Sequence, residues 1–247
     1  NSLKMRPKIF YGNSQNIFVA CNQLLTNIEK GLFEYETDGL IFTPANLGVG
    51  QEKPGDTIEN KKKTWRKCFK WKPPEFNTND FLVTTLKNSS GKDQINDYIE
   101  EGTNASDGEQ IVQYKTLTLR CGYSEKYLNP LQNLIDDVLV VKGRQIEYKP
   151  VPFYPTEPSD NEAHICKIIL KRDNNGTLQM ITEEGDVFSD KTIVEFKYVL
   201  DNKKHMKWVP LRVRDDKTAK YLANEKEYGN NYETANSNWK MIHNPIT

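Results

Sequence analysis

The spacing of apolar residues predicts a helix near the amino end of the chain. Between residues 14 and 30, apolar side chains recur every three or four positions, as they do on one face of an α-helix. Ser14 is a suitable N-cap, and Gly31 is a suitable stop. We expect the resulting apolar stripe to pack into a core, and its members are Ile17, Phe18, Cys21, Leu24, Leu25 and Ile28.

Shorter runs with a period of two predict strands over most of the remaining chain. A first group lies near residues 38–43, 65–72 and 79–86. Residues 88–109 are rich in Gly, Ser and acidic side chains, which is typical of a linker or a surface insertion. A second group lies at about 111–120, 165–171, 177–182, 192–200 and 207–214, with a short helix at about 124–135. Five strands and one helix are the content of an OB-fold barrel.

These elements predict an α+β fold built from two structural regions. Residues 1–87 would contain an antiparallel sheet with a helix, and residues 88–109 would form the linker or insertion. Residues 110–220 would form the OB-fold β-barrel, and residues 221–247 a carboxy-terminal segment.

Composition places the chain among ordinary globular proteins. It has 247 residues, no formal net charge and 36% hydrophobic residues, which is enough for packed cores. No apolar run approaches the ~20 residues that span a membrane, and no signal peptide opens the sequence. The three histidines have no zinc-site spacing, and we expect the scattered cysteines to be buried and reduced. These are Cys21, Cys68, Cys121 and Cys166.

Two lysines on one predicted strand are candidate phosphate ligands. Because side chains alternate across a strand, Lys70 and Lys72 share a face, with their heads starting roughly 7 Å apart. That separation lets two ammonium groups flank neighbouring phosphates. Phe69 and Trp71 would anchor the opposite face in a core. The alternative is an edge strand whose solvated lysines prevent aggregation.

A second cationic block follows the same pattern near the other end of the chain. Arg212, Arg214 and Asp216 would share one strand face, followed by Lys217. Guanidinium groups bind phosphate bidentately. The alternative is a surface strand with salt bridges.

An Asp-Gly pair precedes the first predicted strand. Asp38 and Gly39 lead into an apolar run, which predicts a turn that enters a buried strand with a carboxylate at its mouth. Such a carboxylate can bind a divalent metal through oxygen. An ordinary turn aspartate is the alternative.

Three blocks, in this order, resemble motifs of the covalent nucleotidyltransferase superfamily. Residues 38–42, 70–73 and 212–217 are similar to its fourth, fifth and sixth motifs, in the form found in mRNA capping guanylyltransferases. Residues 77–81 also resemble the capping branch, and the tail resembles the segment that leads into a cap methyltransferase. The resemblance is to large multifunctional capping proteins of large cytoplasmic DNA viruses.

The resemblance implies a function for the chain. Such enzymes transfer GMP from GTP, through a covalent lysyl-GMP intermediate, to the diphosphate 5′ end of RNA. No Lys-x-Asp-Gly sequence, which carries the nucleophilic lysine, occurs here. We therefore expect the chain to be inactive alone and to require the missing N-terminal lobe as a partner. Residues 1–87 would be the carboxy-terminal part of the nucleotidyltransferase domain, and residues 221–247 would lead toward a methyltransferase domain or subunit.

The same resemblance assigns roles to the candidate residues. Nucleotide-binding positions are Gly39, Lys70, Lys72, Arg212 and Lys217. Asp38 would place Mg2+ or Mn2+. Arg214 and Asp216 complete the catalytic set, in which Asp216 would orient Lys217 or contact the metal. The expected setting is the cytoplasm of an infected cell, in a viral factory or virion, with no membrane partner.

Two other function classes stay open at this point. A polynucleotide ligase shares the paired lysines and the OB-fold module. A non-catalytic OB-fold protein could instead use the basic strands only to bind RNA phosphates.

Overall fold

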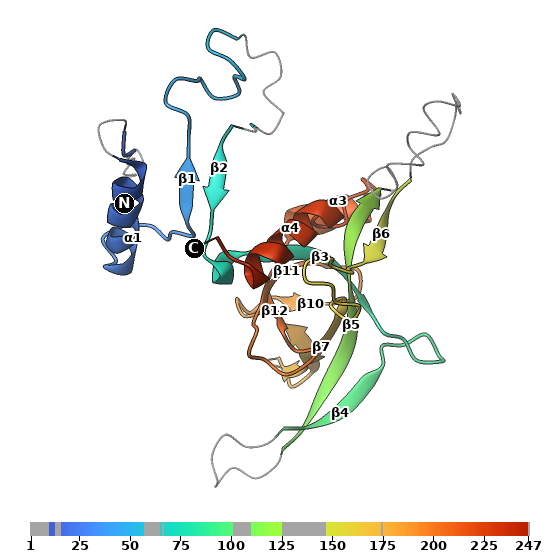
Figure 1. Ribbon diagram of the computed structural model, residues 1–247. Coiled ribbons are helices and arrows are strands. Elements are labelled where there is room, and N and C mark those ends of the chain that lie inside the picture. The colour runs from blue at the N-terminus through green and yellow to red at the C-terminus, as the bar shows by residue number, and fades with distance from the viewer. Residues whose placement is uncertain are drawn as a thin grey trace, which may run out of the picture. The chain divides into compact units, whose positions relative to one another are not determined.

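The protein divides into two compact units, Asn1–Phe76 and Asn77–Thr247, and each is described by itself. The computed structural model describes residues 10–12, 16–56, 65, 67–100, 110–124, 147–173 and 175–246 (Figure 1). The second unit begins before residue 87, where the sequence analysis placed a boundary. The predicted N-cap Ser14 lies outside the described residues, as does the predicted helix at 124–135 except for its first residue, Ser124, which ends a strand.

The first unit contains one helix and a pair of short strands. Helix α1 (Ile17–Glu29) begins at Asn16, whose Oδ1 accepts the N–H of Phe18 at 2.9 Å. Strands β1 (Leu40–Phe42) and β2 (Phe69–Trp71) pair antiparallel, and a 3-10 turn, η1, spans Pro74–Phe76. The helix and both strands are where the sequence predicts them, although each strand is shorter.

The expected core of this unit is not formed among its described residues. Ile17 and Phe18 are 56% and 78% exposed, and in α1 only Ala20 is buried. Phe69, expected to anchor β2, is 66% exposed. The prediction of a packed stripe is therefore wrong for the described part of the unit. One helix and two three-residue strands have too little surface to cover these side chains.

The second unit is built on an antiparallel sheet centred on one long strand, β5 (Gln110–Ser124). The main strand order is β12-β11-β3-β5-β4, and β6 and β7 also pair with β5 (Figure 1). The partner strands are β3 (Thr78–Thr85), β4 (Ile95–Glu100), β6 (Tyr148–Pro152), β7 (Ile165–Ile169), β11 (Ile193–Tyr198) and β12 (Trp208–Val213).

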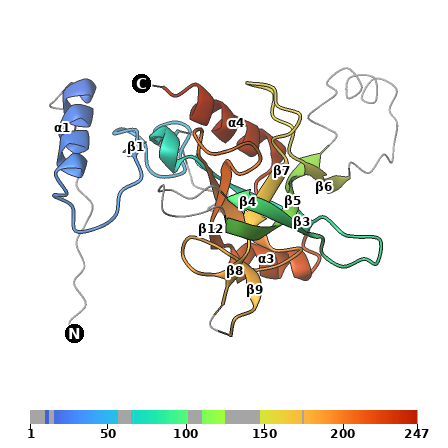
Figure 2. The ribbon, with the colours of Figure 1, turned by 90° about the horizontal axis from the view of Figure 1, so that it is seen from below.

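Smaller elements complete the second unit. Strands β8 (Lys171–Arg172), β9 (Leu178–Ile181) and β10 (Val187–Phe188) form a three-stranded antiparallel sheet. Helices α3 (Asp215–Leu222) and α4 (Tyr232–His243) lie on opposite sides of the larger sheet in the view of Figure 2.

This architecture confirms a mixed fold with antiparallel sheets but does not confirm a closed OB-fold barrel. The strand ladders of the described residues leave the sheet open. A backbone hydrogen bond from the N–H of Lys167 to the carbonyl of His205, 2.6 Å long, joins β7 to the loop before β12. The two edges of the sheet thus approach each other without a continuous ladder.

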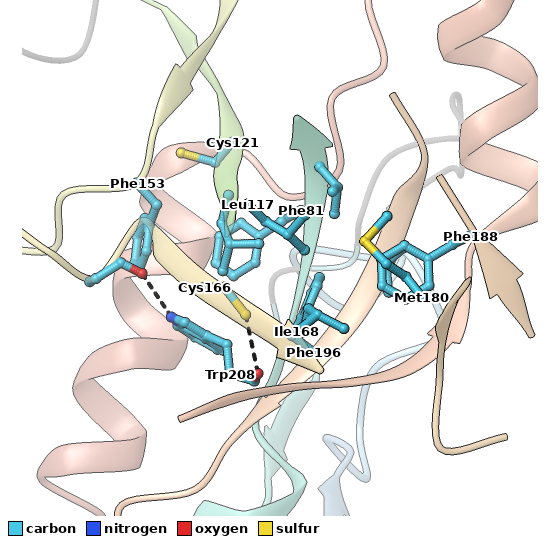
Figure 3. Packing of buried hydrophobic residues seen from close by; sticks show 14 of the residues in the cluster. Phe81, Leu117, Cys121, Phe153, Cys166, Ile168, Met180, Phe188, Phe196 and Trp208 are labelled. Carbon is cyan, nitrogen blue, oxygen red and sulfur yellow. Dashed lines mark hydrogen bonds between the residues drawn. The ribbon is translucent and has the colours of Figure 1, made fainter. Parts of the chain in front are cut away.

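Aromatic side chains form the core of the second unit. Phe81 is fully buried, and its ring lies 5.1–6.1 Å from those of Phe153, Phe196 and Trp208 (Figure 3). The indole of Trp208 donates to the carbonyl of Ala163 at 2.8 Å, so its one polar atom is satisfied inside the core. Trp208 is 2% exposed, as expected for a core residue rather than a base-stacking platform.

The cysteines are unpaired as predicted, but only two of the four are buried. All four cysteines are free thiols. Cys121 and Cys166 are buried, whereas Cys21 and Cys68 are partly exposed. Burial raises the pKa of the Cys121 thiol to about 12, so it is an inert core group at neutral pH.

Helix α4 belongs to the same core. Ala235, Trp239 and Ile242 are buried on one face, and Trp239 contacts Phe153 edge to face, with 6.1 Å between ring centroids. The sequence analysis treated residues 221–247 as a segment leading to another domain. In the structure, helix α4 of this segment packs into the core of the second unit, and a connection to another domain stays a prediction.

Candidate functional site

The Asp38 turn and the lysine strand come together in the first unit. The register of β1 and β2 pairs Leu40 with Trp71 and Ile41 with Lys70. This places Asp38, which precedes β1, beside Lys72, which follows β2. The Lys72 ammonium lies 2.5 Å from Asp38 Oδ2. The sequence analysis did not predict this ion pair.

The electrostatics of this hairpin favour an ionised carboxylate. The hydrogen bond from Lys72 holds the pKa of Asp38 below its usual value, with burial opposing and the charge of Lys70 adding to the effect. Asp38, Lys70 and Lys72 therefore form one charged group with two cations and one anion, and we call it the hairpin cluster.

The structure explains why glycine occupies position 39 between Asp38 and β1. Its φ is +145°, and a Cβ there would lie 2.1 Å from the carbonyl oxygen of Trp71. A side chain at this position would separate β1 from β2. The glycine thus permits the close approach that brings Asp38 to Lys72.

The second cationic block divides between a strand and a helix. Arg212 lies in β12, Arg214 is the N-cap residue of α3, and Asp216 and Lys217 lie in its first turn. The predicted strand through residue 214 therefore ends early, at Val213, and Asp216 does not continue its alternation. The acidic pair at positions 215 and 216 suits the positive end of a helix, which explains why a helix begins here.

A buried carboxylate binds two of these cations. Arg214 Nη1 and Lys217 Nζ donate to the same oxygen, Asp80 Oδ2, at 2.6 and 2.7 Å. Asp80 is 6% exposed and belongs to β3, in the segment 77–81 that resembles the capping branch. Sequence analysis did not assign Asp80 a role.

A second carboxylate, Glu195 of β11, binds the remaining arginine. Arg212 Nε donates to Glu195 Oε2 at 2.8 Å, and the Thr78 hydroxyl donates to Oε1 at 2.6 Å. Burial opposes ionisation of Glu195, but the Thr78 and Arg212 hydrogen bonds lower its pKa. The sequence signal for Glu195 was a carboxylate flanked by the apolar residues Val194 and Phe196.

Strand register explains why these groups meet. Asp80 is the cross-strand partner of Glu195, and Glu195 is the partner of Arg212. Two carboxylates directly opposite each other destabilise a sheet. Arg214 offsets this repulsion, because its Nη1 lies 2.6 Å from Asp80 Oδ2 and 3.8 Å from Glu195 Oε2. We call Asp80, Glu195, Arg212, Arg214 and Lys217 the sheet-end cluster.

Asp216 lies at the edge of the sheet-end cluster. Its Oδ1 is 3.5 Å from Arg214 Nε, whereas Lys217 is held by Asp80. Burial alone would raise the pKa of Asp216, but the charges of Arg214 and Lys217 and their hydrogen bonds together lower it. The described geometry thus associates Asp216 with Arg214.

The hairpin cluster belongs to the first unit and the sheet-end cluster to the second. The sequence-based expectation that both bind one nucleotide stays a prediction. Among the described residues there is no group of three or more His, Cys, Asp or Glu side chains suited to a metal ion. In the same part of the chain, no helix has both the length and the apolar character needed to cross a membrane.

Comparison with known proteins gives one informative similarity. A scan against protein families finds no match. A curated protein of Acanthamoeba polyphaga mimivirus, described as a "Probable mRNA-capping enzyme", is 31% identical over 245 residues. The similarity covers 96% of this chain but only 18% of the mimivirus protein. The chain therefore corresponds to less than a fifth of the length of this relative.

Proposed function

We propose that this chain is part of an mRNA capping guanylyltransferase. The complete enzyme transfers GMP from GTP to the diphosphate 5′ end of RNA. A lysine outside this chain attacks the α-phosphorus, the bond to pyrophosphate breaks, and the resulting phosphoramidate passes GMP to a terminal RNA phosphate oxygen. The similarity over almost the whole chain to the mimivirus protein carries this proposal.

The hairpin cluster supplies the binding groups for the α-phosphate and its neighbours. Lys70 is exposed on β2, and Lys72 is held in place by Asp38 at 2.5 Å. A fixed ammonium binds phosphate with less loss of side-chain entropy than a mobile one. Gly39 contributes by keeping the two strands close.

The sheet-end cluster acts on the leaving group. The second unit carries an OB-fold module that closes over bound GTP and brings Arg212, Arg214 and Lys217 to the β- and γ-phosphates. Cations placed there stabilise the charge that develops as pyrophosphate leaves. The support for this role is the concentration of three cations, with Asp216 beside Arg214, at one end of the sheet.

A metal site is the least supported part of the assignment. Asp38 offers one carboxylate, and an ammonium already pairs with it. Mg2+ prefers six oxygen ligands in octahedral geometry. The described residues do not fit a complete Mg2+ or Mn2+ site, so we route no step through a metal.

The remaining partners follow from the same proposal. RNA with a 5′ diphosphate is the acceptor, and the missing N-terminal lobe supplies the nucleophile. The mimivirus protein is much longer than this chain, which is consistent with further domains such as a cap methyltransferase. The setting is a viral factory or virion in the cytoplasm.

Labelled GTP tests the proposal directly. The complete enzyme, incubated with GTP labelled at the α-phosphate, is expected to yield a labelled protein that survives denaturation and releases label in acid. The 247-residue chain alone should give no such band, because it contains no Lys-x-Asp-Gly sequence. Labelling by ATP in place of GTP would indicate a ligase, and labelling by neither would overturn the enzymatic assignment.

An RNA-binding module without catalysis is the second candidate, and one observation favours it. The cations of the sheet-end cluster are matched by internal carboxylates, as in a structural network. In that case the chain would bind RNA in a salt-dependent manner without responding to nucleoside triphosphate.

A further inference from the structure

Both backbone polar groups of Asp80 are hydrogen-bonded to Asn230. Its N–H donates to Asn230 Oδ1 at 2.7 Å, and its carbonyl accepts the N–H of Asn230 at 2.8 Å. Gly229 lies so close that a Cβ there would be 2.3 Å from the carbonyl oxygen of Asp80. Together with the pairing to Glu195 on β11, these contacts fix Asp80 in the sheet.

Arg214 and Lys217 depend on this fixed carboxylate for their orientation. Both donate to Asp80 Oδ2, although they reach it from 134 and 137 residues away in sequence. The carboxylate side chain is 8% exposed, whereas those of Arg214 and Lys217 are 26% and 21% exposed. The cations thus reach solvent more than the anion that holds them.

Most hydrogen-bond donors of the two cations are not used by Asp80. A guanidinium has five N–H donors and an ammonium has three, and one of each is directed at Asp80. The donors directed away from it are available in part to solvent. Without Asp80, the two neighbouring cations would repel each other and move into water. Binding an anion would then cost more side-chain entropy than it does when Asp80 already holds them.

We propose that Asp80 is a positioning residue that holds Arg214 and Lys217 as a preformed site for an oligophosphate. This proposal rests on the proposed function and assigns the β- and γ-phosphates of the nucleotide to the outward donors of these two side chains. Asp80 acts through the two cations and touches no phosphate. Substitution of Asp80 should weaken oligophosphate binding, although it removes a negative charge and would, by charge alone, strengthen it.

The test uses inorganic tripolyphosphate and the 247-residue chain. Calorimetry gives the Kd, and the Nε–H signals of arginine in NMR spectra report whether Arg214 is held in one orientation. For Asp80→Asn we expect at least tenfold weaker binding and loss of a distinct Arg214 signal. The matched control is Asp93→Asn, because Asp93 also accepts from two lysines, Lys87 at 2.6 Å and Lys115 at 2.8 Å.

The control separates positioning from general loss of stability. Asp93→Asn should destabilise the chain to a similar degree and leave the Kd within twofold. If Asp80→Asn does not fold, Asp80→Glu keeps the charge but moves the carboxylate outward by one methylene. We expect the Glu variant to bind at least threefold more weakly.

Each outcome has a distinct meaning. Equal or tighter binding by either Asp80 variant overturns the positioning role and indicates that Asp80 competes with the ligand. Equal weakening in the Asp93 control overturns it in favour of a general stability effect. Failure of the unaltered chain to bind tripolyphosphate contradicts the phosphate site of the proposed function itself, and the positioning role with it.

Discussion

The cations that resemble a phosphate-binding motif also serve the fold. Asp80 is almost fully buried and Glu195 is largely covered, and a buried carboxylate is costly unless it is paired and hydrogen-bonded. Arg212, Arg214 and Lys217 supply the pairing. A substitution in this cluster therefore changes stability as well as any ligand binding, and each must be measured.

Lys72 provides the residue-scale test of catalysis. In the complete enzyme, Lys72→Ala is expected to lower formation of the labelled adduct at least tenfold, which corresponds to about 1.4 kcal/mol in the barrier. Lys67→Ala is the control, because Lys67 belongs to the same segment but pairs only loosely with Glu52, at 3.8 Å. An adduct yield that Lys72→Ala leaves unchanged would count against the assignment.

Arg212 tests a role limited to the leaving group. Arg212→Ala in the complete enzyme should slow adduct formation while leaving GTP affinity nearly unchanged, because the contact is made in the closed state. Rapid-quench kinetics and equilibrium binding measure the two quantities. Equal losses in both would contradict the proposed lid.

Gly229 tests the backbone contact that fixes Asp80. Gly229 has a φ of +84°, which alanine adopts only with strain, and the Cβ of Gly229→Ala would also clash with the Asp80 carbonyl. We expect a loss of about 2–4 kcal/mol in unfolding free energy, measured by urea denaturation. Gly185→Ala is the control, since it has a φ of +96° and no atom within 4 Å of the added Cβ. It should lose about 1 kcal/mol from conformation alone, and an equal loss in both variants would remove the steric argument.

Glu195 makes stability depend on pH. The pKa of Glu195 is lower in the folded state than its unfolded value of 4.5. Its contribution to the free energy of unfolding is therefore fully present above pH 4.5 and is lost as pH falls through the folded pKa. Thermal melting should therefore show Tm falling below about pH 4.5, with a shallower fall for Glu195→Gln. An unchanged slope in this variant would show that other carboxylates account for the acid sensitivity.

At the scale of elements, α4 is a structural part of the second unit. Its side chains Ala235, Trp239 and Ile242 are buried, and the first two belong to the hydrophobic core of this unit. The amino end of this helix is determined locally, since Asn231 Oδ1 accepts the N–H of Thr234 in the first turn. The three apolar positions have helical spacing. The sequence analysis interpreted this segment only by its motif resemblance and did not predict the helix.

Truncation of one α4 side chain tests this role. Trp239→Ala should cost about 3–5 kcal/mol, because it removes a large buried ring that the surrounding core cannot replace. Lys240→Ala on the same helix is partly exposed and pairs with Glu157, so it should cost about 1 kcal/mol or less. Urea denaturation measures both. A small effect of Trp239→Ala would mean that α4 is not integral to the unit.

At the scale of the whole molecule, the buried hydrophobic cluster lies entirely in the second unit. The described residues of the first unit leave Phe18 and Phe69 exposed. We therefore expect residues 77–247 to unfold cooperatively when expressed alone, with a Tm within a few degrees of that of the full chain. Residues 1–76 alone should show no cooperative transition. Calorimetry checks both, and a sharp transition from residues 1–76 would indicate a core that the described residues do not include.

Much of the second unit could be predicted from local pattern. Strands β3, β7, β9, β11 and β12 lie where short apolar or alternating runs placed them, because such runs leave a direct signal in the sequence. Strand β6 contains Pro150 and Pro152, and proline argues against a strand within a sheet, although it is tolerated on an edge strand. Strand β4 lies inside a stretch that its polar composition made resemble a linker.

The sequence by itself determined which charged residues the chain carries, the order of its three motif-like blocks and most of its strands. These depend on neighbours a few positions apart. Only the tertiary structure decided which charges are paired. The register of β3, β11 and β12 brings Asp80 and Glu195 beside Arg212 and Arg214 from distant parts of the sequence. No local pattern encodes such a contact, because it depends on how backbone hydrogen bonds align separate strands.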